Sequence, residues 1–324
     1  MTSKPKVFVT RRWPASVEAQ LKALYDVTLN EDDRPLTADE FRSALQDYDA
    51  VCPTVCDSFP ADVINVDNKR CKILGNFGVG FNHIDINAAK RNNLVVTNTP
   101  GVLTESTADI ALTLLLMSAR RGAEGDQLVR SKQWRGWSPT HMLGSEVTGT
   151  TLGLIGFGRI AIATARKAHH GFGMKIIFFN PSTPAQSVID ELGATRCDTV
   201  EEVMSTADFI SLHCPGGPAT RHLIDAGMIG LMKPSAHLIN TARGDVVDSK
   251  ALIEALRKNK ITGAGLDVYE NEPDIDEGFL TLRNVTLLPH LGSATLDTRT
   301  AMGERVLANL AAFFAGQEPG DRVA

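Results

Sequence analysis

Three residues in the C-terminal half of the chain have side chains suited to the reduction of a carbonyl group. Arg243 ends the segment Asn-Thr-Ala-Arg, Glu272 precedes a proline, and His290 lies between Pro289 and a glycine-containing loop. A histidine can give a proton to a carbonyl oxygen near neutral pH. A carboxylate can hydrogen-bond the imidazole and favour its protonated form, and a planar guanidinium suits a carboxylate beside the carbonyl. Together the three predict proton transfer coupled to hydride transfer.

Each of these residues also has a structural alternative. A single histidine is more often a packing residue than a catalytic one, and an isolated arginine serves equally well in a structural ion pair. What distinguishes His290 is its position at the end of an apolar segment. The other histidines lack a comparable neighbourhood, and we interpret most of them as surface or packing residues: His83, His141, His169, His170, His213, His222 and His237.

A glycine-rich turn lies upstream of these residues, between an apolar segment and a helix-forming one. The segment 152–155 is followed by Gly-Phe-Gly-Arg-Ile-Ala. Gly156 allows a tight turn, and Gly158 lets a pyrophosphate approach the backbone. The amides of the helix start, at Arg159 and Ile160, favour negative charge. A strand, a turn and a helix in this order predict a dinucleotide site more firmly than the glycines alone.

The residues after the next strand affect the choice between NAD and NADP. The expected strand 175–179 is followed by Asn-Pro-Ser-Thr, at a place where NAD enzymes use an acid to bind the ribose. Asn180 would not repel a 2′-phosphate, and the hydroxyls of Ser182 and Thr183 could donate hydrogen bonds to it. No Arg or Lys lies between Lys175 and Arg196 to pair with that phosphate. We expect NADP as the cofactor, with NAD also possible, unless Asn180 is only a turn residue.

Strand-like and helix-like segments alternate along the chain, which is typical of parallel sheets covered by helices on both faces. The first four expected strands are Lys6–Thr10, Asp49–Cys52, Ile73–Phe77 and Val95–Thr97. After a helix expected over 104–121 come six more, Leu152–Ile155, Lys175–Phe179, Phe209–Leu212, His237–Asn240, Gly263–Asp267 and Val285–Leu288. A further helix is expected over 296–315.

These elements predict an α/β fold with two doubly wound parallel-sheet domains. We expect a Rossmann cofactor domain over residues 100–289, which includes the dimerisation segment. It would be inserted into a flavodoxin-like substrate-binding domain formed by residues 1–99 and 290–324.

Composition excludes several other classes of protein. A chain of 324 residues with 43% hydrophobic and 22% charged residues is typical of a globular protein, and a net charge of -5 predicts no binding to nucleic acid or anionic membranes. The N-terminal segment Met1–Lys6 is polar and does not resemble a signal peptide, and the apolar run Ile110–Met117 is too short to cross a bilayer. The five cysteines are scattered and predict no zinc site. We expect a cytoplasmic protein without a metal.

Several short segments match motifs of one enzyme family: Gly156–Ala161, Cys214-Pro215, Asn240–Gly244, Gly265–Val268, Glu272-Pro273 and Pro289–Ala294. Through them the chain resembles the D-isomer-specific 2-hydroxyacid dehydrogenase family over nearly its whole length. The resemblance implies that Arg243, Glu272 and His290 are catalytic. It also implies that backbone amides around Val79 and Gly80 bind the carboxylate of the substrate.

The resemblance further implies a cofactor site and a homodimer. The residues that would line the cofactor site are Thr107, Cys214, Pro215, Thr220, Thr241, Ala242, Asp267 and Gly292. In the family, the equivalent of Asp267 holds the nicotinamide carboxamide. The region 104–149 would form the subunit interface, from which Trp137 would reach the substrate site of the partner. The alternative is that Trp134 and Trp137 both pack within their own subunit.

The segments 134–139 and 274–279 are most similar to the glycerate dehydrogenase and glyoxylate/hydroxypyruvate reductase branch of the family. We therefore expect an NAD(P)H-dependent reductase that converts glyoxylate and hydroxypyruvate to glycolate and D-glycerate. One alternative is a dehydrogenase for another D-2-hydroxy acid. Another is a nucleotide-sensing, corepressor-like binding protein, although this chain lacks the long disordered tails of that branch.

Overall fold

The computed structural model describes residues 4–324, which form two units, so the first three residues of the polar N-terminal segment lie outside the description. The chain leaves unit 1 after Leu103 and returns to it after Ser293, where the sequence predicted crossings after 99 and 289. His290 therefore belongs to unit 2, together with Arg243 and Glu272. Within residues 4–324, no helix combines the length and hydrophobicity needed to span a membrane.

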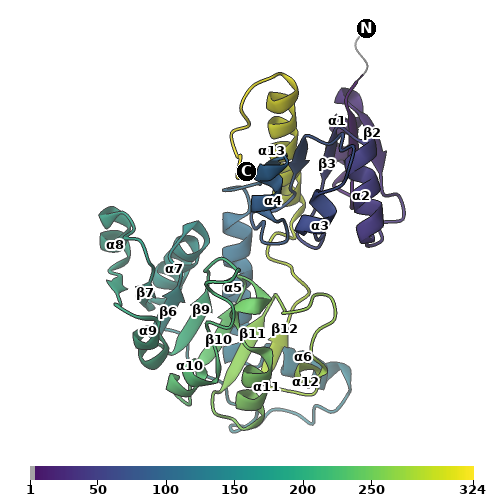
Figure 1. Ribbon diagram of the computed structural model, residues 1–324. Helices are drawn as coiled ribbons and strands as arrows, with labels where there is room; N and C mark the ends of the chain where they lie inside the picture. The colour runs from purple at the N-terminus through teal and green to yellow at the C-terminus, as the bar shows by residue number, and fades with distance from the viewer. Residues whose placement is uncertain (1–3) are drawn as a thin grey trace. The chain divides into compact units, whose positions relative to one another are not determined.

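Unit 1 is built on a five-stranded parallel sheet with the order β2-β1-β3-β4-β5. Figure 1 draws the N-terminal part of this unit in purple and blue and its C-terminal segment in yellow. Its strands are β1 (Lys6–Val9), β2 (Asp26–Leu29), β3 (Ala50–Cys52), β4 (Ile73–Gly75) and β5 (Val95–Thr97). This is the flavodoxin-like order, as predicted. The prediction missed β2. This strand lies at the edge of the sheet and buries only Leu29, so its sequence has no continuous apolar run.

Successive residues of the strands in unit 1 face two separate cores. Val51 of β3 packs with α2 (Ala38–Asp47), α3 (Ala61–Ile64) and α4 (Ile86–Arg91) on one face. Ala50 and Cys52 pack on the other face with α1 (Ala15–Leu24) and α13 (Leu296–Phe314). Both faces of the sheet are thus covered by helices, and the C-terminal helix α13 completes the unit in which the chain begins.

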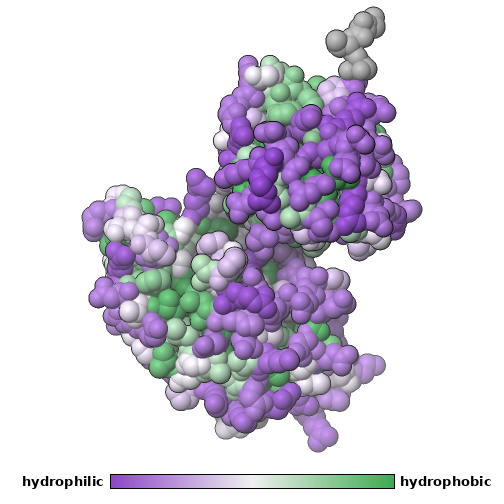
Figure 2. Space-filling model, in the orientation of Figure 1, coloured by the Kyte–Doolittle hydropathy of each residue, from purple (hydrophilic) through white to green (hydrophobic). Residues whose placement is uncertain are grey.

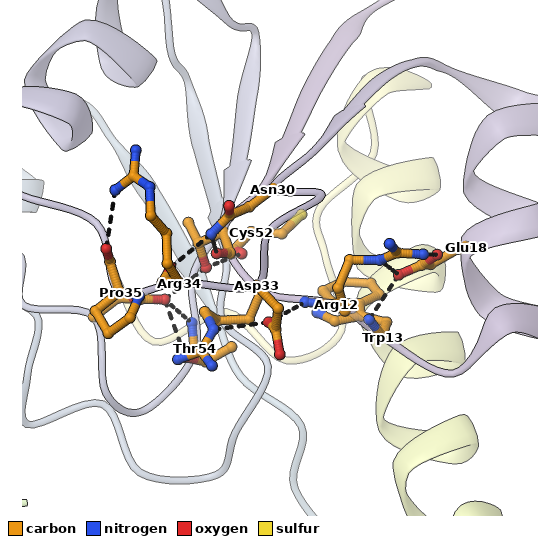
Figure 3. Close-up of polar contacts among 12 residues, drawn as sticks. Arg12, Trp13, Glu18, Asn30, Asp33, Arg34, Pro35, Cys52 and Thr54 are labelled. Atoms are coloured by element: carbon orange, nitrogen blue, oxygen red, sulfur yellow. Dashed lines mark hydrogen bonds and ion pairs between the residues drawn. The ribbon is translucent and has the colours of Figure 1, made fainter. Parts of the chain in front are cut away.

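Polar contacts hold the loops that follow β1 and β2 in unit 1 (Figure 3). The guanidinium of Arg12 donates to both carboxylate oxygens of Glu18 at 2.8 Å, and its backbone N–H donates to Asp33 at 2.9 Å. The side-chain amide of Asn30 donates to the carbonyl oxygen of Arg34 at 2.7 Å. Because acidic partners already neutralise Arg12, we interpret this network as structural.

Unit 2 is built on a seven-stranded parallel sheet with the order β12-β11-β10-β9-β6-β7-β8. Its strands are β6 (Thr151–Ile155), β7 (Lys175–Phe179), β8 (Thr195–Arg196), β9 (Phe209–Leu212), β10 (His237–Asn240), β11 (Gly263–Leu266) and β12 (Val285–Leu287). The order is that of a Rossmann fold with one further strand. The sequence predicted six strands and missed β8, because two exposed residues at a sheet edge leave no hydrophobic pattern.

Helices cover both faces of the sheet in unit 2. α5 (Thr104–Ala119) packs against α7 (Arg159–Phe172) and on β10 and β11. α9 (Val200–Thr206), α10 (Ala226–Leu231) and α11 (Ser249–Arg257) pack together, and α9 lies on β6. Glycines bring the layers close: a Cβ on Gly265 would lie 2.8 Å from Leu114 of α5, and one on Gly153 would lie 2.6 Å from Val203 of α9.

The shorter helices of unit 2 lie outside these two layers or in connections. They are α6 (Gly122–Arg130), α8 (Gln186–Leu192), α12 (Glu277–Leu280) and the single 3₁₀ turn η1 (Gly244–Val246).

The face drawn in Figure 2 is largely hydrophilic, with hydrophobic patches among the polar groups.

Candidate active site

Most of the predicted site residues in unit 2 lie where parallel strands end. The glycine turn follows β6, Asn180 follows β7, and Cys214 follows β9. The catalytic candidates Arg243, Glu272 and His290 lie in the connections after β10, β11 and β12. Because the carboxyl ends of parallel strands meet at one edge of a sheet, these loops form one continuous edge. Thr107 reaches the same edge from α5, where its hydroxyl donates to the carbonyl oxygen of Gly292 at 3.1 Å.

The glycine turn has the backbone geometry that a dinucleotide requires. Gly156 has φ +86°, and a Cβ there would lie 2.7 Å from the backbone nitrogen of Cys214. A Cβ on Gly158 would meet no atom within 4 Å, so this residue faces open space at the start of α7. No side chain caps α7, which leaves its first N–H groups available to an anion. In the described residues, the buried hydroxyl of Thr241 also has no hydrogen-bond partner. These features fit a nicotinamide dinucleotide.

The turn after β7 is tied to both of its neighbours. The side-chain oxygen of Asn180 accepts from the backbone N–H of Phe157 at 3.0 Å, and its amide donates to the hydroxyl of Ser182 at 2.9 Å. Arg196 of β8 donates to the hydroxyl of Thr183 at 2.9 Å and to the carbonyl oxygen of Asn180 at 3.1 Å. The sequence has no Arg or Lys between Lys175 and Arg196, but Arg196 itself lies beside the turn in space although it is distant in sequence.

His290 and Glu272 form a hydrogen-bonded pair. Nδ1 of His290 donates to Oε2 of Glu272 at 2.7 Å, and Oε1 of Glu272 accepts from the backbone N–H of Tyr269 at 2.9 Å. Burial opposes ionisation of Glu272, but the hydrogen bond from His290 and the positive charges of His290 and Arg243 outweigh it, so the pKa of this carboxyl is lowered. The side chains of His290 and Glu272 remain 32% and 24% exposed.

The buried carboxylate of Asp267 fixes the loop that carries His290. Its two oxygens accept from the backbone N–H groups of Leu291 at 2.6 Å and Gly292 at 2.8 Å. The backbone N–H of His290 donates to the carbonyl oxygen of Asp267 at 3.0 Å. Burial raises the pKa of Asp267, and the two N–H donors oppose that shift. His290 has φ +55°, an uncommon backbone conformation that these bonds hold in place.

Arg243 lies directly before Gly244, where the chain passes another loop at very short range. A Cβ on Gly244 would lie 1.8 Å from the carbonyl carbon of Tyr269, so no other residue fits there. This contact brings Arg243 close to the loop of Glu272, whose pKa it helps to lower. Its guanidinium also donates to the carbonyl oxygen of Ala242 at 2.7 Å.

The predicted substrate loop of unit 1 is held in place by hydrogen bonds that its carbonyl oxygens accept. The side-chain amide of Asn76 donates to the carbonyl oxygens of Gly78 and Gly80 at 3.0 Å, and that of Asn98 donates to the carbonyl oxygen of Val79 at 2.8 Å. The backbone N–H groups of Val79 and Gly80 donate to no acceptor within residues 4–324. Two amides left without an acceptor in a fixed loop are suited to bind an anion.

Two contacts of this edge were not predicted from the sequence. Tyr269 donates its hydroxyl to the carbonyl oxygen of Leu288 at 2.9 Å and so joins the ends of β11 and β12. Arg196 was overlooked because β8 was overlooked. The sequence did offer a signal for Arg196, because it is the single basic residue that follows α8. No comparable signal in the sequence pointed to Tyr269.

Comparisons with known proteins agree with this geometry. The family model for the D-isomer specific 2-hydroxyacid dehydrogenase NAD binding domain matches residues 112–292. The chain is 43% identical over 324 residues to a glyoxylate reductase from Thermococcus litoralis, a match that covers 99% of this chain and 97% of the relative. It is 35% identical over 316 residues to a glycerate dehydrogenase from Hyphomicrobium methylovorum, covering 98% of each.

A solved structure is similar to the whole chain. It is the NADPH-dependent glyoxylate/hydroxypyruvate reductase from Sinorhizobium meliloti in complex with NADP and malonate, with a TM-score of 0.85, 34% identity, and coverage of 99% of this chain and 97% of that one. The chain belongs to the D-isomer specific 2-hydroxyacid dehydrogenase family. The predictions of the family, of the fold class and of an NAD(P)-dependent oxidoreductase are confirmed.

Replacing His290 tests its role as the proton donor. We expect His290→Ala to lower kcat for 2-oxo acid reduction by roughly 10²–10⁴-fold, because the carbonyl oxygen loses its acid. Binding of the reduced cofactor, measured by quenching of protein fluorescence, should change little. The exposed His170 of α7 provides the control, since His170→Ala should keep the normal rate. A near-normal rate in His290→Ala would remove this residue from the mechanism.

Replacing Glu272 tests the pairing through the pH profile. Because the pKa of Glu272 is lowered, the carboxylate stays ionised at neutral pH and stabilises the protonated imidazole. In Glu272→Gln the imidazole loses its charged partner, and we expect the pH dependence of kcat/KM to shift toward lower pH. An unchanged profile with an unchanged rate would contradict the pairing.

Proposed function

We propose that this protein reduces glyoxylate and hydroxypyruvate to glycolate and D-glycerate with a nicotinamide cofactor, preferably NADPH. The observation that carries the proposal is the pair of His290 and Glu272, placed with Arg243 at the carboxyl edge of a Rossmann sheet. The relatives support it, because proteins with the names glyoxylate reductase, glycerate dehydrogenase and glyoxylate/hydroxypyruvate reductase all match nearly the full chain.

The proposed mechanism assigns one task to each catalytic side chain. A reduced nicotinamide dinucleotide held at the glycine turn of Gly156 and Gly158 would supply the hydride for the carbonyl carbon. Nε2 of protonated His290 gives its proton to the carbonyl oxygen, so the product is the neutral alcohol and the imidazole is left neutral. Glu272 keeps the imidazole oriented through Nδ1 and stabilises its charge before transfer. The guanidinium of Arg243 binds the oxygen atoms of the 2-oxo acid and polarises the carbonyl group.

The substrate carboxylate has two proposed sites of contact. In unit 2 it is the fork of Arg243. In unit 1, taken by itself, it is the pair of amides at Val79 and Gly80, in a loop whose carbonyl groups accept from Asn76 and Asn98. Backbone amides and a guanidinium both favour a negative charge, which fits small carboxylates that carry a neighbouring carbonyl.

A substrate panel tests the proposed function. We expect glyoxylate and hydroxypyruvate to give kcat/KM values at least tenfold above those of pyruvate and of bulkier 2-oxo acids, measured from the decrease in absorbance of the reduced cofactor. The His290→Ala variant serves as the negative control for a contaminating reductase. A higher value for a bulky 2-oxo acid would favour the alternative of another D-2-hydroxy acid dehydrogenase. No turnover of any 2-oxo acid would overturn the proposal.

Cofactor preference is a separate prediction. Asn180 replaces the acid that would repel a 2′-phosphate, so we expect NADPH to be preferred over NADH by about ten- to a hundredfold in kcat/KM, equal to about 1.4–2.7 kcal/mol. Asn180→Asp should reverse the preference, because the carboxylate would repel the phosphate and bind the ribose hydroxyls. A clear preference of the unmodified protein for NADH would refute this prediction.

We further propose that the protein is a homodimer that forms through the segment 104–149 and acts in the cytoplasm. Helix α6 in this segment buries none of its residues. The following loop exposes large apolar side chains, with Trp134 at 53%, Trp137 at 81% and Leu143 at 68%. A hollow of about 590 Å³ borders the same segment. Exposed aromatic groups of this kind are typical of a surface that a partner covers. Trp137 remains our candidate for contact with the substrate of the partner subunit.

The homodimer predicts a mass of twice the 35.0 kDa of the chain in sedimentation equilibrium at micromolar concentration. Trp137→Ser and Leu143→Ser together should shift the mass toward that of a monomer, because they remove apolar area from the interface. The exposed Leu24 of α1, at 53%, offers a matched control, and Leu24→Ser should leave the mass unchanged. A monomeric mass for the unmodified protein would contradict the proposal.

A further inference from the structure

Arg196 is placed beside the turn 180–183 by the smallest strand of the sheet. β8 pairs in parallel with β7, so that Thr195 lies opposite Ile177 and Arg196 lies opposite Phe178. The guanidinium therefore points along the sheet edge toward the residues that follow β7. It donates to the hydroxyl of Thr183 at 2.9 Å and to the carbonyl oxygen of Asn180 at 3.1 Å.

Because of these contacts, the hydroxyl groups of Ser182 and Thr183 can act as hydrogen-bond donors toward a ligand. The hydroxyl oxygen of Ser182 accepts from the side-chain amide of Asn180 at 2.9 Å, and that of Thr183 accepts from Arg196. A hydroxyl whose oxygen already accepts can direct its own hydrogen toward a third group. The turn thus presents two O–H groups and the unused N–H groups of one guanidinium, an arrangement that suits an anion with several oxygen atoms.

The positive charge of Arg196 is not neutralised by the protein. Within residues 4–324 it forms no ion pair with an acid, whereas Arg166 on the neighbouring helix α7 is paired to Glu191 at 2.7 Å. The side chain of Arg196 is exposed and can be reached by a ligand. Asn180 cannot replace an acid that binds the ribose hydroxyls, because its side-chain oxygen already accepts from the N–H of Phe157 and its amide donates to Ser182.

We infer that Arg196, with the hydroxyls of Ser182 and Thr183, binds the 2′-phosphate of the dinucleotide that seats on the glycine turn. The inference rests on the proposed use of a nicotinamide cofactor and names the residue that sets its specificity. A phosphate of nearly two negative charges gains charge-assisted hydrogen bonds from the guanidinium, and a ribose hydroxyl at the same place gains much less. Asn180 acts as a positioning residue, because it holds the turn 180–183 against the glycine turn after β6.

The test measures binding of two adenosine fragments that differ only in the 2′-phosphate, namely adenosine 2′,5′-bisphosphate and adenosine 5′-monophosphate. In Arg196→Gln, titration calorimetry should show adenosine 2′,5′-bisphosphate binding roughly 10- to 100-fold more weakly, because a charged hydrogen-bond donor is lost. The affinity for adenosine 5′-monophosphate should change less than about twofold. When binding is measured without substrate, Arg196→Gln should likewise weaken the binding of NADPH and leave the binding of NADH nearly unchanged.

Three further measurements separate recognition from a structural role. Arg196→Lys keeps the charge without the planar fork and should restore part of the affinity for adenosine 2′,5′-bisphosphate. Arg166→Gln, which removes an exposed arginine of the same unit, should not discriminate between the fragments. The affinity of the unmodified protein for adenosine 2′,5′-bisphosphate should fall more steeply with salt than that of Arg196→Gln.

Two results would overturn the inference. Equal losses for both fragments would mean that Arg196 only supports the turn, and unchanged affinities would mean that the phosphate binds elsewhere. Because no 2-oxo acid is present in these titrations, an incorrect assignment of the substrate would leave the outcome unaffected. Thermal unfolding followed by circular dichroism confirms that each variant is folded before its affinities are compared.

Discussion

The interaction on which the active site depends is the contact of a buried carboxylate with the backbone of the loop that carries the histidine. Asp267 is only 1% exposed, and both of its oxygens accept N–H groups from the two residues after His290. A buried carboxylate without such donors would cost several kcal/mol, so the loop has little freedom to move away. The left-handed backbone of His290 costs on the order of 1–2 kcal/mol, which these bonds offset. The imidazole is thereby directed to Glu272.

The position of Arg243 depends on a close contact between two segments of the backbone. The chain at Gly244 passes so near the carbonyl group of Tyr269 that a side chain is excluded, and this contact places Arg243 beside the loop of Glu272. Burial would raise the pKa of Glu272, but the hydrogen bond from His290, the charge of His290 and the N–H of Tyr269 lower it, and the charge of Arg243 adds a smaller effect in the same direction. The charges of the site are therefore set by how closely the loops after β10, β11 and β12 pack.

The sequence predicted those parts of the fold whose residues are buried on both sides. Central strands such as β9 and β10 are fully buried, so they form continuous apolar segments, and the site residues directly follow them. The edge strands β2 and β8 were missed, because a strand with exposed residues has no such pattern. The close approach at Gly244 was also not foreseen, since a glycine in a motif does not reveal which backbone it faces.

The same distinction, between buried and exposed residues, separates the two ends of the proposed cofactor site. At the catalytic end, Asp267 and Gly244 are buried and restrict any change of residue. At the end that we propose binds adenosine, Ser182, Thr183 and Arg196 are exposed side chains at a sheet edge, where substitutions disturb no core. Parallel strands bring together residues that a connecting helix separates in sequence, so a search for a basic residue directly after β7 fails to find one on β8. A fold of this kind can therefore keep its chemistry fixed while its choice between NAD and NADP changes by a few surface residues.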